Sequence, residues 1–412
     1  MRVTPDQLLD LFLRLVSTPS PSGSERAVAD LVLEHLRAAG LQPEEDDSAA
    51  AAEAGSGCIY VSLPGGAQGA SGAQATSGTQ GAPGAQAASG AQATSGAQGT
   101  SGSQGTPILL CAHIDTVAVA GPITPVVADG VVRSDGSTIL GADDKAAVAV
   151  LLAVLADLAA DPPACGVEAL FTTCEEVGLR GAKAFDLTRV QAKAGFVLDS
   201  SGHPREVIVR APEARTITAE FHGVPAHAGI EPEKGRSAIA GAAKAIAGMK
   251  LGRIDELTTA NVGVIEGGVA INIVPEHCVV RGEARSRDAA RLAAQVQHML
   301  DSIALGATEA GVDVTTNVAL EYESFTLAED SLPARIAAGA VRALGLEPEF
   351  VGTGGGSDVN VFNARGLPSV NMSAGYEGVH TSAESMPLDR LWQAYELVHA
   401  LVAFAAGVPP TA

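Results

Sequence analysis

The 412-residue sequence lacks an apolar run long enough to cross a membrane, because polar residues interrupt its longest apolar stretches. It also lacks a recognisable secretory signal. The N-terminal stretch MRVTPDQLLDLFLRLVSTPS carries Asp6 and Asp10, and its apolar residues recur every three to four positions, as in an amphipathic helix. Positive charge is scarce, with 26 Lys and Arg against 47 Asp and Glu and a formal net charge of -21. Because this charge opposes binding to nucleic acid or an anionic membrane, we predict a cytoplasmic globular protein with neither as a partner.

Paired cysteine spacings are missing as well. The five cysteines are odd in number, and none of their separations is typical of a metal site. This pattern argues against a disulfide framework and agrees with a reducing compartment. We expect five buried free thiols, at Cys58, Cys111, Cys165, Cys174 and Cys278.

The length of the chain favours two folding units, because 412 residues exceed what one hydrophobic core usually supports. Residues 66–105 form an uncharged repeat of Gly, Ala, Gln, Ser and Thr without a large apolar side chain. Such a segment cannot bury a core, so we predict a disordered insertion between strand-like segments at 58–65 and 107–117. Closing a loop costs only about 0.6 kcal/mol more for each doubling of its length, so the fold can tolerate the insertion.

Short apolar strands alternate with helices through residues 1–212 and again through 323–412. This order predicts an α/β domain with a sheet that carries helices on both faces. Residues 213–322 instead follow the order βαββαβ, which is typical of a ferredoxin-like domain. The second domain is therefore predicted to be an insertion.

Acids and a histidine follow the ends of the predicted strands, where open α/β sheets bind their ligands. His113 and Asp115 stand two residues apart at the end of a strand, so their side chains point to the same side. A carboxylate in that position can hold the second ring nitrogen of a metal-binding imidazole. Taken alone, this motif more often belongs to a capped strand end.

Carboxylates also occur in adjacent pairs, in GADDK at Asp143 and in CEE at Glu175 and Glu176. Helix capping explains one acid of GADDK, but adjacent like charges repel each other unless a cation or solvent offsets them. One acid of a pair can bind a metal while the other faces substrate as a base. With Asp199 after GFVL and His380 in GVHTSAE, the set of oxygen and nitrogen donors suits two divalent ions such as zinc.

The ordered motifs HIDT, GADDK, CEEVG, LDSSG, GVPAHAGIEPEKG, NIVPE with GEARS, GGGSDVN and HTSAE cover nearly the whole chain except 66–105. They resemble the peptidase T-like branch of the di-zinc metallopeptidase family. That family also includes glutamate carboxypeptidase, acetylornithine deacetylase and succinyl-diaminopimelate desuccinylase. The sequence departs from the family pattern at Ala147, where Gly is common, and at Ser200 and Ser201 after the metal aspartate. Neither departure removes a ligand.

The resemblance implies that the α/β domain is a zinc-peptidase-like catalytic domain with a mixed sheet and that the inserted domain serves as a lid or a dimerisation domain. It also implies a role for each of the acids and histidines above. Asp143 would bridge two Zn²⁺ ions, for which Co²⁺ or Mn²⁺ could substitute. His113 and Asp199 would hold one ion, and Glu176 and His380 the other. In the same scheme Glu175 would be the general base and Asp115 would orient His113.

The resemblance also implies a homodimer formed through the inserted domain, with His227 reaching the site of the other subunit to steady the oxyanion. Apart from the family, a turn histidine beside Pro225 and Gly229 is the simpler interpretation. Asn272 and Arg285 match positions that line the substrate cleft of relatives.

The implied activity is hydrolysis of amide bonds in short peptides, by an aminotripeptidase. The stretches GIEPEKGRSAIA and LGRIDELTTANVG favour this branch. An N-acyl amino acid deacylase of the same family is an alternative, since relatives share the metals and base and differ in the pocket. A catalytically silent binding protein is a third hypothesis, which the retention of Glu175 and all five candidate ligands disfavours.

Overall fold

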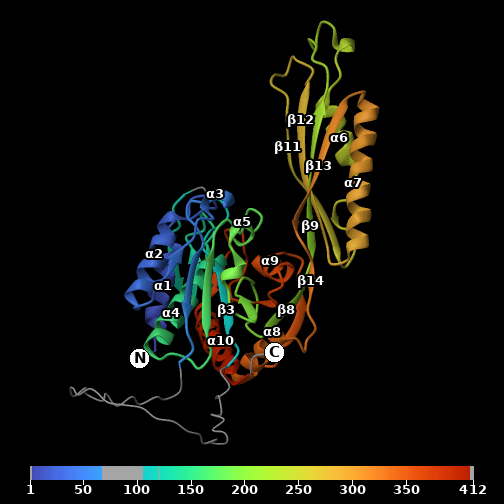
Figure 1. Cartoon of the computed structure of the whole chain (residues 1–412). Helices are drawn as coiled ribbons and strands as arrows, with labels where there is room; N and C mark the ends of the chain where they lie inside the picture. The colour runs from blue at the N-terminus through green and yellow to red at the C-terminus, as the bar shows by residue number, and fades with distance from the viewer. Residues whose placement is uncertain (1, 67–104, 120, 409–412) are drawn as a thin grey trace, which may run out of the picture.

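We analysed a computed structural model that describes residues 2–66, 105–119 and 121–408. The predicted disordered repeat lies outside these residues, apart from Gly66 and Gly105 at its two ends. The chain forms a large body that holds both ends of the described chain and an elongated small body that projects from it (Figure 1). We call residues 213–322 the small domain and the rest the large domain, and the two boundaries stay predictions.

The large domain is built on a nine-stranded mixed sheet with the order β1-β2-β6-β3-β7-β16-β8-β14, in which β15 also pairs with β8. Its central strands β6 (Val167–Thr172), β3 (Ile108–His113) and β7 (Ala194–Val197) are parallel neighbours, and every residue in them is buried. Continuous apolar runs of this kind occur where both faces of a sheet are covered. The other strands are β1 (Glu44–Glu45), β2 (Ile59–Leu63), β8 (Glu206–Ala211), β14 (Phe325–Thr326), β15 (Glu349–Gly352) and β16 (Ser369–Met372).

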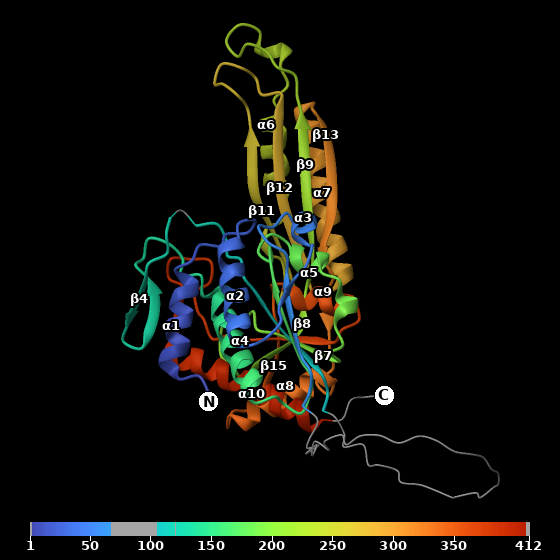
Figure 2. The same cartoon turned by 60° about the vertical axis from the view of Figure 1, so that its left-hand side comes forward.

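Helices cover both faces of this sheet, as predicted. On one face the core joins sheet residues to α1 (Pro5–Val16), α2 (Arg26–Ala38), α4 (Ala142–Ala160), α8 (Leu332–Ala343) and α10 (Leu388–Gly407). On the other face it joins them to α5 (Arg180–Ala184) and α9 (Asp358–Ala364). Figure 2 shows α1, α2 and α4 together on the first face. Smaller elements are α3 (Ala49–Ala52), the 3₁₀ turn Leu187–Arg189, and a three-stranded sheet of β4 (Pro125–Ala128), β5 (Val131–Ser134) and β17 (Ser385–Pro387).

The small domain is an antiparallel sheet with the order β10-β11-β12-β9-β13, packed against α6 and α7. The order of its four long strands is that of a ferredoxin-like domain, which confirms the predicted fold class. Ser237 caps α6 by accepting the backbone N–H of Ala240 at 3.2 Å, and Asp288 caps α7. The elements are β9 (Glu213–His222), the 3₁₀ turn Pro232–Lys234, α6 (Ala238–Gly248), β10 (Gly252–Arg253), β11 (Thr258–Gly267), β12 (His277–Ser286), α7 (Ala289–Ala310) and β13 (Asp313–Tyr322).

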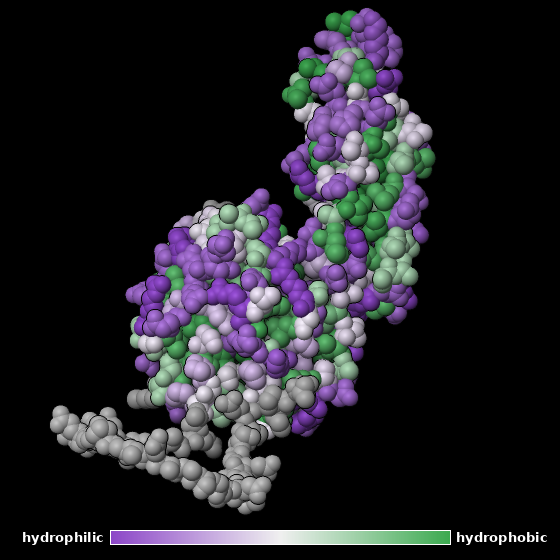
Figure 3. Space-filling model, in the orientation of Figure 1, coloured by the Kyte–Doolittle hydropathy of each residue, from purple (hydrophilic) through white to green (hydrophobic). Residues whose placement is uncertain are grey.

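The end of the small domain farthest from the large domain exposes apolar side chains, seen as green atoms at the top of Figure 3. Ile230 is 71% exposed, Val269 89% and Ile271 fully exposed. Elsewhere, all five cysteines are free and buried, as expected. In the described parts of the chain, each helix is too short or too polar to cross a membrane.

A buried carboxylate ties the N-terminal segment to α4 and α10. Asp157 of α4 accepts the backbone N–H of Val3 at 3.0 Å, the ring N–H of His399 at 3.0 Å, and the hydroxyl of Tyr395. Burial lowers the pKa of His399 and outweighs the opposing hydrogen bond to Asp157. The folded chain therefore binds a proton at His399 more weakly than the unfolded chain does.

This linkage predicts a pH-dependent stability. Below the unfolded pKa of about 6.5, the unfolded chain takes up the proton first, so acid weakens the fold as the pH falls toward the folded pKa. We expect His399→Gln to cost about 1 kcal/mol at pH 7.5 and to make the loss of thermal stability between pH 7.5 and 5.5 smaller than in the wild type. Thermal unfolding across this range measures the effect. His222→Gln, at an exposed position of β9, is the control, and equal pH slopes for both variants would contradict the prediction.

Candidate metal centre and catalytic cleft

His113 is the last residue of β3, at the edge where the parallel strands β6, β3 and β7 all end. Its side chain is 2% exposed, and its Nε2 atom lies 3.2 Å from Asp143 Oδ1 and 3.8 Å from Asp199 Oδ1. The Nδ1–H donates to the backbone carbonyl of Asp115 at 3.0 Å, while the carboxylate of Asp115 lies 3.5 Å away. The ring is thus held by both groups of Asp115, with Nε2 directed at the acids.

The carboxylate of Asp115 also fixes the turn that carries Glu175 and Glu176. It is fully buried and accepts the backbone N–H of Glu175 at 3.0 Å and of Glu176 at 3.3 Å. Ser22 donates its hydroxyl to the same carboxylate at 2.7 Å. Burial raises the pKa of Asp115, but the hydrogen bonds from His113 and Ser22 outweigh it and leave the pKa below its usual value. Asp115 therefore stays charged and orients several groups at once.

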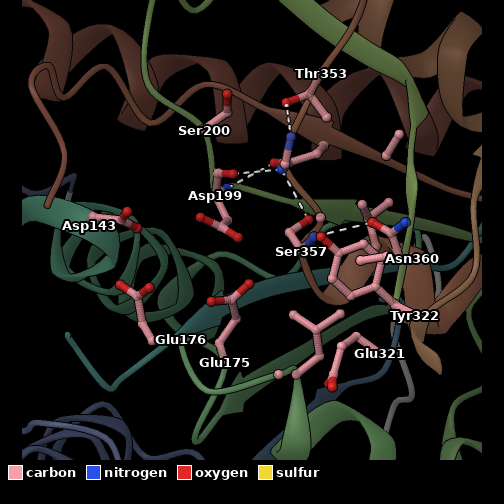
Figure 4. A pocket seen from close by; sticks show the side chains of 18 of the residues that line it. Asp143, Glu175, Glu176, Asp199, Ser200, Glu321, Tyr322, Thr353, Ser357 and Asn360 are labelled. Carbon is pink, nitrogen blue, oxygen red and sulfur yellow. Dashed lines mark hydrogen bonds between the residues drawn. The ribbon is translucent and has the colours of Figure 1, made fainter. Parts of the chain in front are cut away.

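Asp143 lies at the start of α4, where the backbone of Asp143 and Asp144 departs from helical geometry. Neither aspartate caps the helix. Glu384 instead holds the turn that leads into the helix: it is 1% exposed and accepts the backbone N–H groups of Leu140, Gly141 and Asp143 at 2.8 to 3.0 Å. The carboxylate of Asp143 is left free to face the site (Figure 4).

Asp199 follows the end of β7, so its carboxylate reaches the same edge of the sheet. Tyr376 joins it to Asp143, because the Tyr376 hydroxyl donates to Asp143 Oδ1 at 3.1 Å and to Asp199 Oδ1 at 3.2 Å. Burial raises the pKa of Asp199 to about 7. An acid with this property gains from a neighbouring cation, which would favour its charged form.

Glu176 and His380 face Asp143 from the other side. His380 Nε2 lies 3.0 Å from Glu176 Oε1 and 3.4 Å from Asp143 Oδ2. Hydrogen bonds to these two carboxylates raise the pKa of His380 to about 10. His380 has a positive φ of 61°, a strained conformation for a residue with a side chain, and its ring is about half exposed.

Two sets of donor atoms come together at this edge and share one residue. His113, Asp143 and Asp199 form one set, and Asp143, Glu176 and His380 form the other, with the atoms of each set within 4.8 Å of one another. Carboxylate oxygens and imidazole nitrogens are ligands that divalent zinc accepts. Both sets comprise residues that the sequence singled out, and Asp143 is the shared member. The donor chemistry fits a pair of divalent ions.

Glu175 stands beside these sets without belonging to either. Its side chain is 8% exposed, lines the cavity next to Asp143 and Asp199, and points toward it in Figure 4. Burial raises the pKa of Glu175 well above its usual value, and the charge of Asp199 adds to this. A buried carboxylate that takes up protons readily is suited to act as a base.

The acids line a cavity of about 620 Å³ between the domains. Its far wall comes from the base of the small domain, including Thr216, Glu283, Arg285, Glu321 and Tyr322. Of the residues that line the cavity, Arg285 is the only Arg or Lys, and Glu283 holds its guanidinium through two hydrogen bonds of 2.8 and 3.0 Å. The structure thus places Arg285 in the cavity wall, and its role toward a substrate stays a prediction.

His227 and Asn272 lie elsewhere, on two adjacent loops at the tip of the small domain. The backbone N–H of Ala228 donates to the carbonyl of Asn272 at 2.9 Å, and both predicted residues are exposed. Neither lines the cavity of its own chain.

The sequence prediction missed Tyr376, Glu384 and Ser22, which contact the site through side-chain hydrogen bonds. Glu384 is the last residue of the motif HTSAE, so its place in that motif was the available signal. Tyr376 and Ser22 lie in polar, Gly-rich or Ser-rich stretches without a distinctive pattern.

Comparison with known proteins places the chain among metallopeptidases. The sequence model of the peptidase dimerisation domain matches residues 213–308, and that of peptidase family M28 matches residues 97–236. The uncharacterized protein YqjE of Bacillus subtilis is 35% identical over 405 residues, which cover 98% of this chain and 100% of the relative. Peptidase T of Aeromonas hydrophila is 29% identical over 276 residues, 66% of this chain and 67% of the relative.

Solved structures give the same result over the full length. The tripeptidase of Staphylococcus aureus has a TM-score of 0.81 and 33% identity, and covers 99% of this chain and 100% of its own. The aminopeptidase PepT of Bacillus cereus has a TM-score of 0.76 and 35% identity, with 98% and 99% covered. The dinuclear metal-binding M20 peptidase YXEP of Bacillus subtilis, with a TM-score of 0.65 over 98% of this chain and 99% of its own, is 14% identical and shares the fold.

Proposed function

Because the chain belongs to the peptidase T-like family of M20 metallopeptidases, we propose that it hydrolyses amide bonds of short peptides as an aminotripeptidase. The family and the peptidase class predicted from the motifs are confirmed by these relatives. The observation that carries the proposed reaction is the pair of donor sets that share Asp143, with Glu175 beside them in one cavity.

The proposed cofactor is a pair of Zn²⁺ ions, with Co²⁺ or Mn²⁺ as substitutes. Asp143 would bridge them, His113 and Asp199 would hold one, and Glu176 and His380 the other. When bound, such a pair would polarise the scissile carbonyl and lower the pKa of a water to near neutrality. The closely spaced acids support this proposal, because their buried charges need a cation to offset them.

In this reaction Glu175 accepts a proton from the attacking water and later delivers it to the leaving amine. Its backbone is fixed by Asp115, so the side chain keeps its position while the proton moves. Asp115 also holds His113 in the tautomer that leaves Nε2 free for a metal. These roles are proposals that rest on the hydrogen bonds and on burial.

Arg285 is the proposed partner of the substrate's C-terminal carboxylate, because it places a guanidinium in the small-domain wall of the cavity and presents planar donors that match a carboxylate. We expect the zinc-loaded protein to cleave tripeptides faster than dipeptides, tetrapeptides, tripeptide amides or N-acetyl amino acids. Steady-state assays across this panel test the function. Turnover of N-acetyl amino acids alone would favour the deacylase alternative, and absence of bound metal together with inactivity would favour the binding protein.

The protein is proposed to act as a homodimer in the cytoplasm. The match of residues 213–308 to a dimerisation domain supports the dimer, and the five buried free thiols favour a reducing compartment. In this dimer His227 would steady the oxyanion in the other subunit, beside Asn272. The exposed position of both residues, remote from the cavity of their own chain, supports a role between subunits.

A mixing experiment tests the reach of His227. His227→Ala is expected to lower kcat roughly 10²- to 10³-fold, because an oxyanion donor is lost. When His227→Ala chains and Glu175→Gln chains are dissociated and mixed in equal amounts, half of the dimers contain one of each, and each mixed dimer has one complete site. Activity should return to about a quarter of the wild-type value.

Each variant reassociated with itself provides the baseline for this experiment. No recovery in the mixture, with mixed dimers demonstrated by mass spectrometry, would place His227 in its own chain's site or outside catalysis.

A further inference from the structure

The chain crosses between the two domains at two adjacent points. It leaves through Pro212, between β8 and β9, and returns through Glu323, between β13 and β14. On the large-domain side β8 pairs with β14, and on the small-domain side β9 pairs with β13. The two crossing segments therefore run side by side and form the covalent connection that any reorientation of the small domain must bend.

Asn360 holds both crossing segments. Its side-chain Nδ2 group donates to the carbonyl of Glu323 at 2.7 Å and to the carbonyl of Pro212 at 3.2 Å. The side chain is 1% exposed and lies in the wall of the catalytic cavity (Figure 4). Because unpaired buried polar groups are costly, this amide resists separation of the two segments.

The same amide is linked to Asp199 through two further polar side chains. The Oδ1 atom of Asn360 accepts the backbone N–H of Ser357 at 3.1 Å, and the Ser357 hydroxyl accepts from Asn371 Nδ2 at 3.1 Å. Asn371 Nδ2 also donates to the carbonyl of Asp199 at 2.6 Å, and the backbone N–H of Asp199 donates to Asn371 Oδ1 at 3.0 Å. Ser357 and Asn371 are 3% and 4% exposed, so water does not compete for these bonds.

The glycine-rich turn before α9 receives two more contacts from the small domain. A Cβ atom on Gly356 would lie 2.3 Å from the ring of Tyr322, the last residue of β13. A Cβ atom on Gly352 would lie 2.0 Å from the guanidinium of Arg287. Glycine at both positions allows these side chains to rest directly on the backbone, at the end of β15 and in the turn before Ser357.

We propose that Asn360 is a positioning residue that couples the orientation of the small domain to the backbone of Asp199. A shift of the crossing segments moves the amide of Asn360, and the bonds through Ser357 and Asn371 pass this shift to Asp199. Because coupling between two sites is reciprocal, metal binding at Asp199 biases the orientation of the small domain. The inference rests on the proposed function only in taking Asp199 as a metal ligand.

The orientation can be followed in the full-length protein as the distance between two nitroxide labels. Cysteines introduced at the exposed positions Asp6 on α1 and Thr308 on α7 report on the two domains. An excess of unlabelled chain keeps the measured distances within one subunit. Zn²⁺ affinity is measured separately, by competition with a chromophoric chelator, so that neither readout requires peptide hydrolysis.

In the wild-type sequence, Zn²⁺ is expected to shift the distance distribution. Asn360→Ala should reduce this shift and weaken Zn²⁺ binding roughly 10-fold, the lower end of the effect seen for groups that support metal ligands. Ser357→Ala keeps the bonds of Asn360 to the crossing segments and the bonds of Asn371 to Asp199, and it should also reduce the shift.

Asn363→Ala is the matched control. Asn363 lies on the same helix and also makes three amide hydrogen bonds, to Val359 and Ser369, but it contacts neither crossing segment nor Asp199. We expect it to leave both the shift and the Zn²⁺ affinity at wild-type values.

Equal effects of Asn360→Ala and Asn363→Ala, or wild-type behaviour of Ser357→Ala, would overturn the proposal. If Asn360→Ala does not fold, Ser357→Ala against Asn363→Ala decides the question. If the wild type binds no Zn²⁺, the proposed function fails. The hold of Asn360 on the two crossing segments is then tested without metal: Asn360→Ala must broaden the distance distribution, and Asn363→Ala must not. Unchanged distances in both variants would then refute it.

Discussion

Replacing Glu175 with Gln is expected to lower kcat for a tripeptide roughly 10²- to 10⁴-fold, the contribution typical of a general base. The amide has nearly the same shape as the carboxylate but cannot accept the proton of the attacking water. Glu175 belongs to neither donor set, so metal content should stay at the wild-type value. Its backbone N–H donates to Asp115 and does not depend on the side chain, so KM should change little.

The pH dependence gives a second signature of the same residue. A base whose pKa is raised holds its proton at low pH, so the activity of the wild type should fall as the pH falls and Glu175 becomes protonated. The Gln side chain does not titrate in this range, so the residual activity of the variant should not show this fall at low pH. Profiles of kcat/KM against pH for both proteins measure the difference.

Glu168→Gln provides a control for burying an amide in place of a carboxylate. Glu168 is also buried, near the start of β6, where it accepts the hydroxyl of Tyr60 and the backbone N–H of Ala192, remote from the donor sets. This change should lower thermal stability and leave kcat intact. A Glu175→Gln protein with full metal content and a kcat within a factor of about ten of the wild type would exclude the proposed base.

Local sequence singled out His113, Glu175 and Asp199 as polar residues at the ends of apolar strands, and the family resemblance supplied their roles. Apolar runs that stop at His113, Glu175 and Asp199 predict buried parallel strands, and such strands end at one edge of a sheet. Because β6, β3 and β7 are neighbours in that sheet, their terminal residues meet. This prediction is possible because the apolar run that forms the buried strand and the polar residue that ends it are adjacent in the sequence.

Pairing between distant segments could not be predicted in the same way. The strand-like segments around 58–65 and 107–117 do not pair with each other, because β6 lies between β2 and β3. Asn360 and Asn371 look like ordinary helix and strand residues in the sequence, yet their amides connect the crossing segments to Asp199. Such roles depend on chain segments that only the tertiary fold brings together.

The same distinction explains the helix start at GADDK. Local rules favour an aspartate as the cap of α4, since its carboxylate would accept free backbone N–H groups. In the structure neither aspartate does this, and Glu384, which is 241 residues from Asp143 in the sequence, accepts the backbone N–H groups of the turn instead. Because Glu384 binds these N–H groups, the carboxylate of Asp143 remains available to both donor sets. The sequence thus departs from the local rule at a residue of the proposed metal site.

Asp143→Asn is expected to have the largest effect on metal binding, because Asp143 is the one residue common to both donor sets. The amide keeps the shape of the side chain but removes the charge and one donor oxygen. We expect metal content to fall from two ions per chain to one or none, and kcat/KM to fall at least about 10³-fold, more than the 10- to 100-fold typical of residues that only support ligands. Metal analysis by mass spectrometry and steady-state kinetics measure both.

Asp144→Asn makes the same chemical change one residue along the chain and serves as the control. Asp144 is fully buried, one of its oxygens accepts the backbone N–H of His113 at 3.3 Å, and it belongs to neither donor set. Burial raises the pKa of Asp144 well above its usual value, so burial favours the neutral form of this side chain and an amide suits the same site. Metal content should therefore survive in this variant.

Chelation completes the comparison of the two aspartates. Wild type and Asp144→Asn should lose activity with a chelator and recover it when Zn²⁺ is restored, whereas Asp143→Asn should not recover at the same Zn²⁺ concentration. Retention of two ions by Asp143→Asn would remove Asp143 as the bridging residue. Equal loss in both variants would instead mean that the helix start, and not the shared carboxylate, determines metal binding.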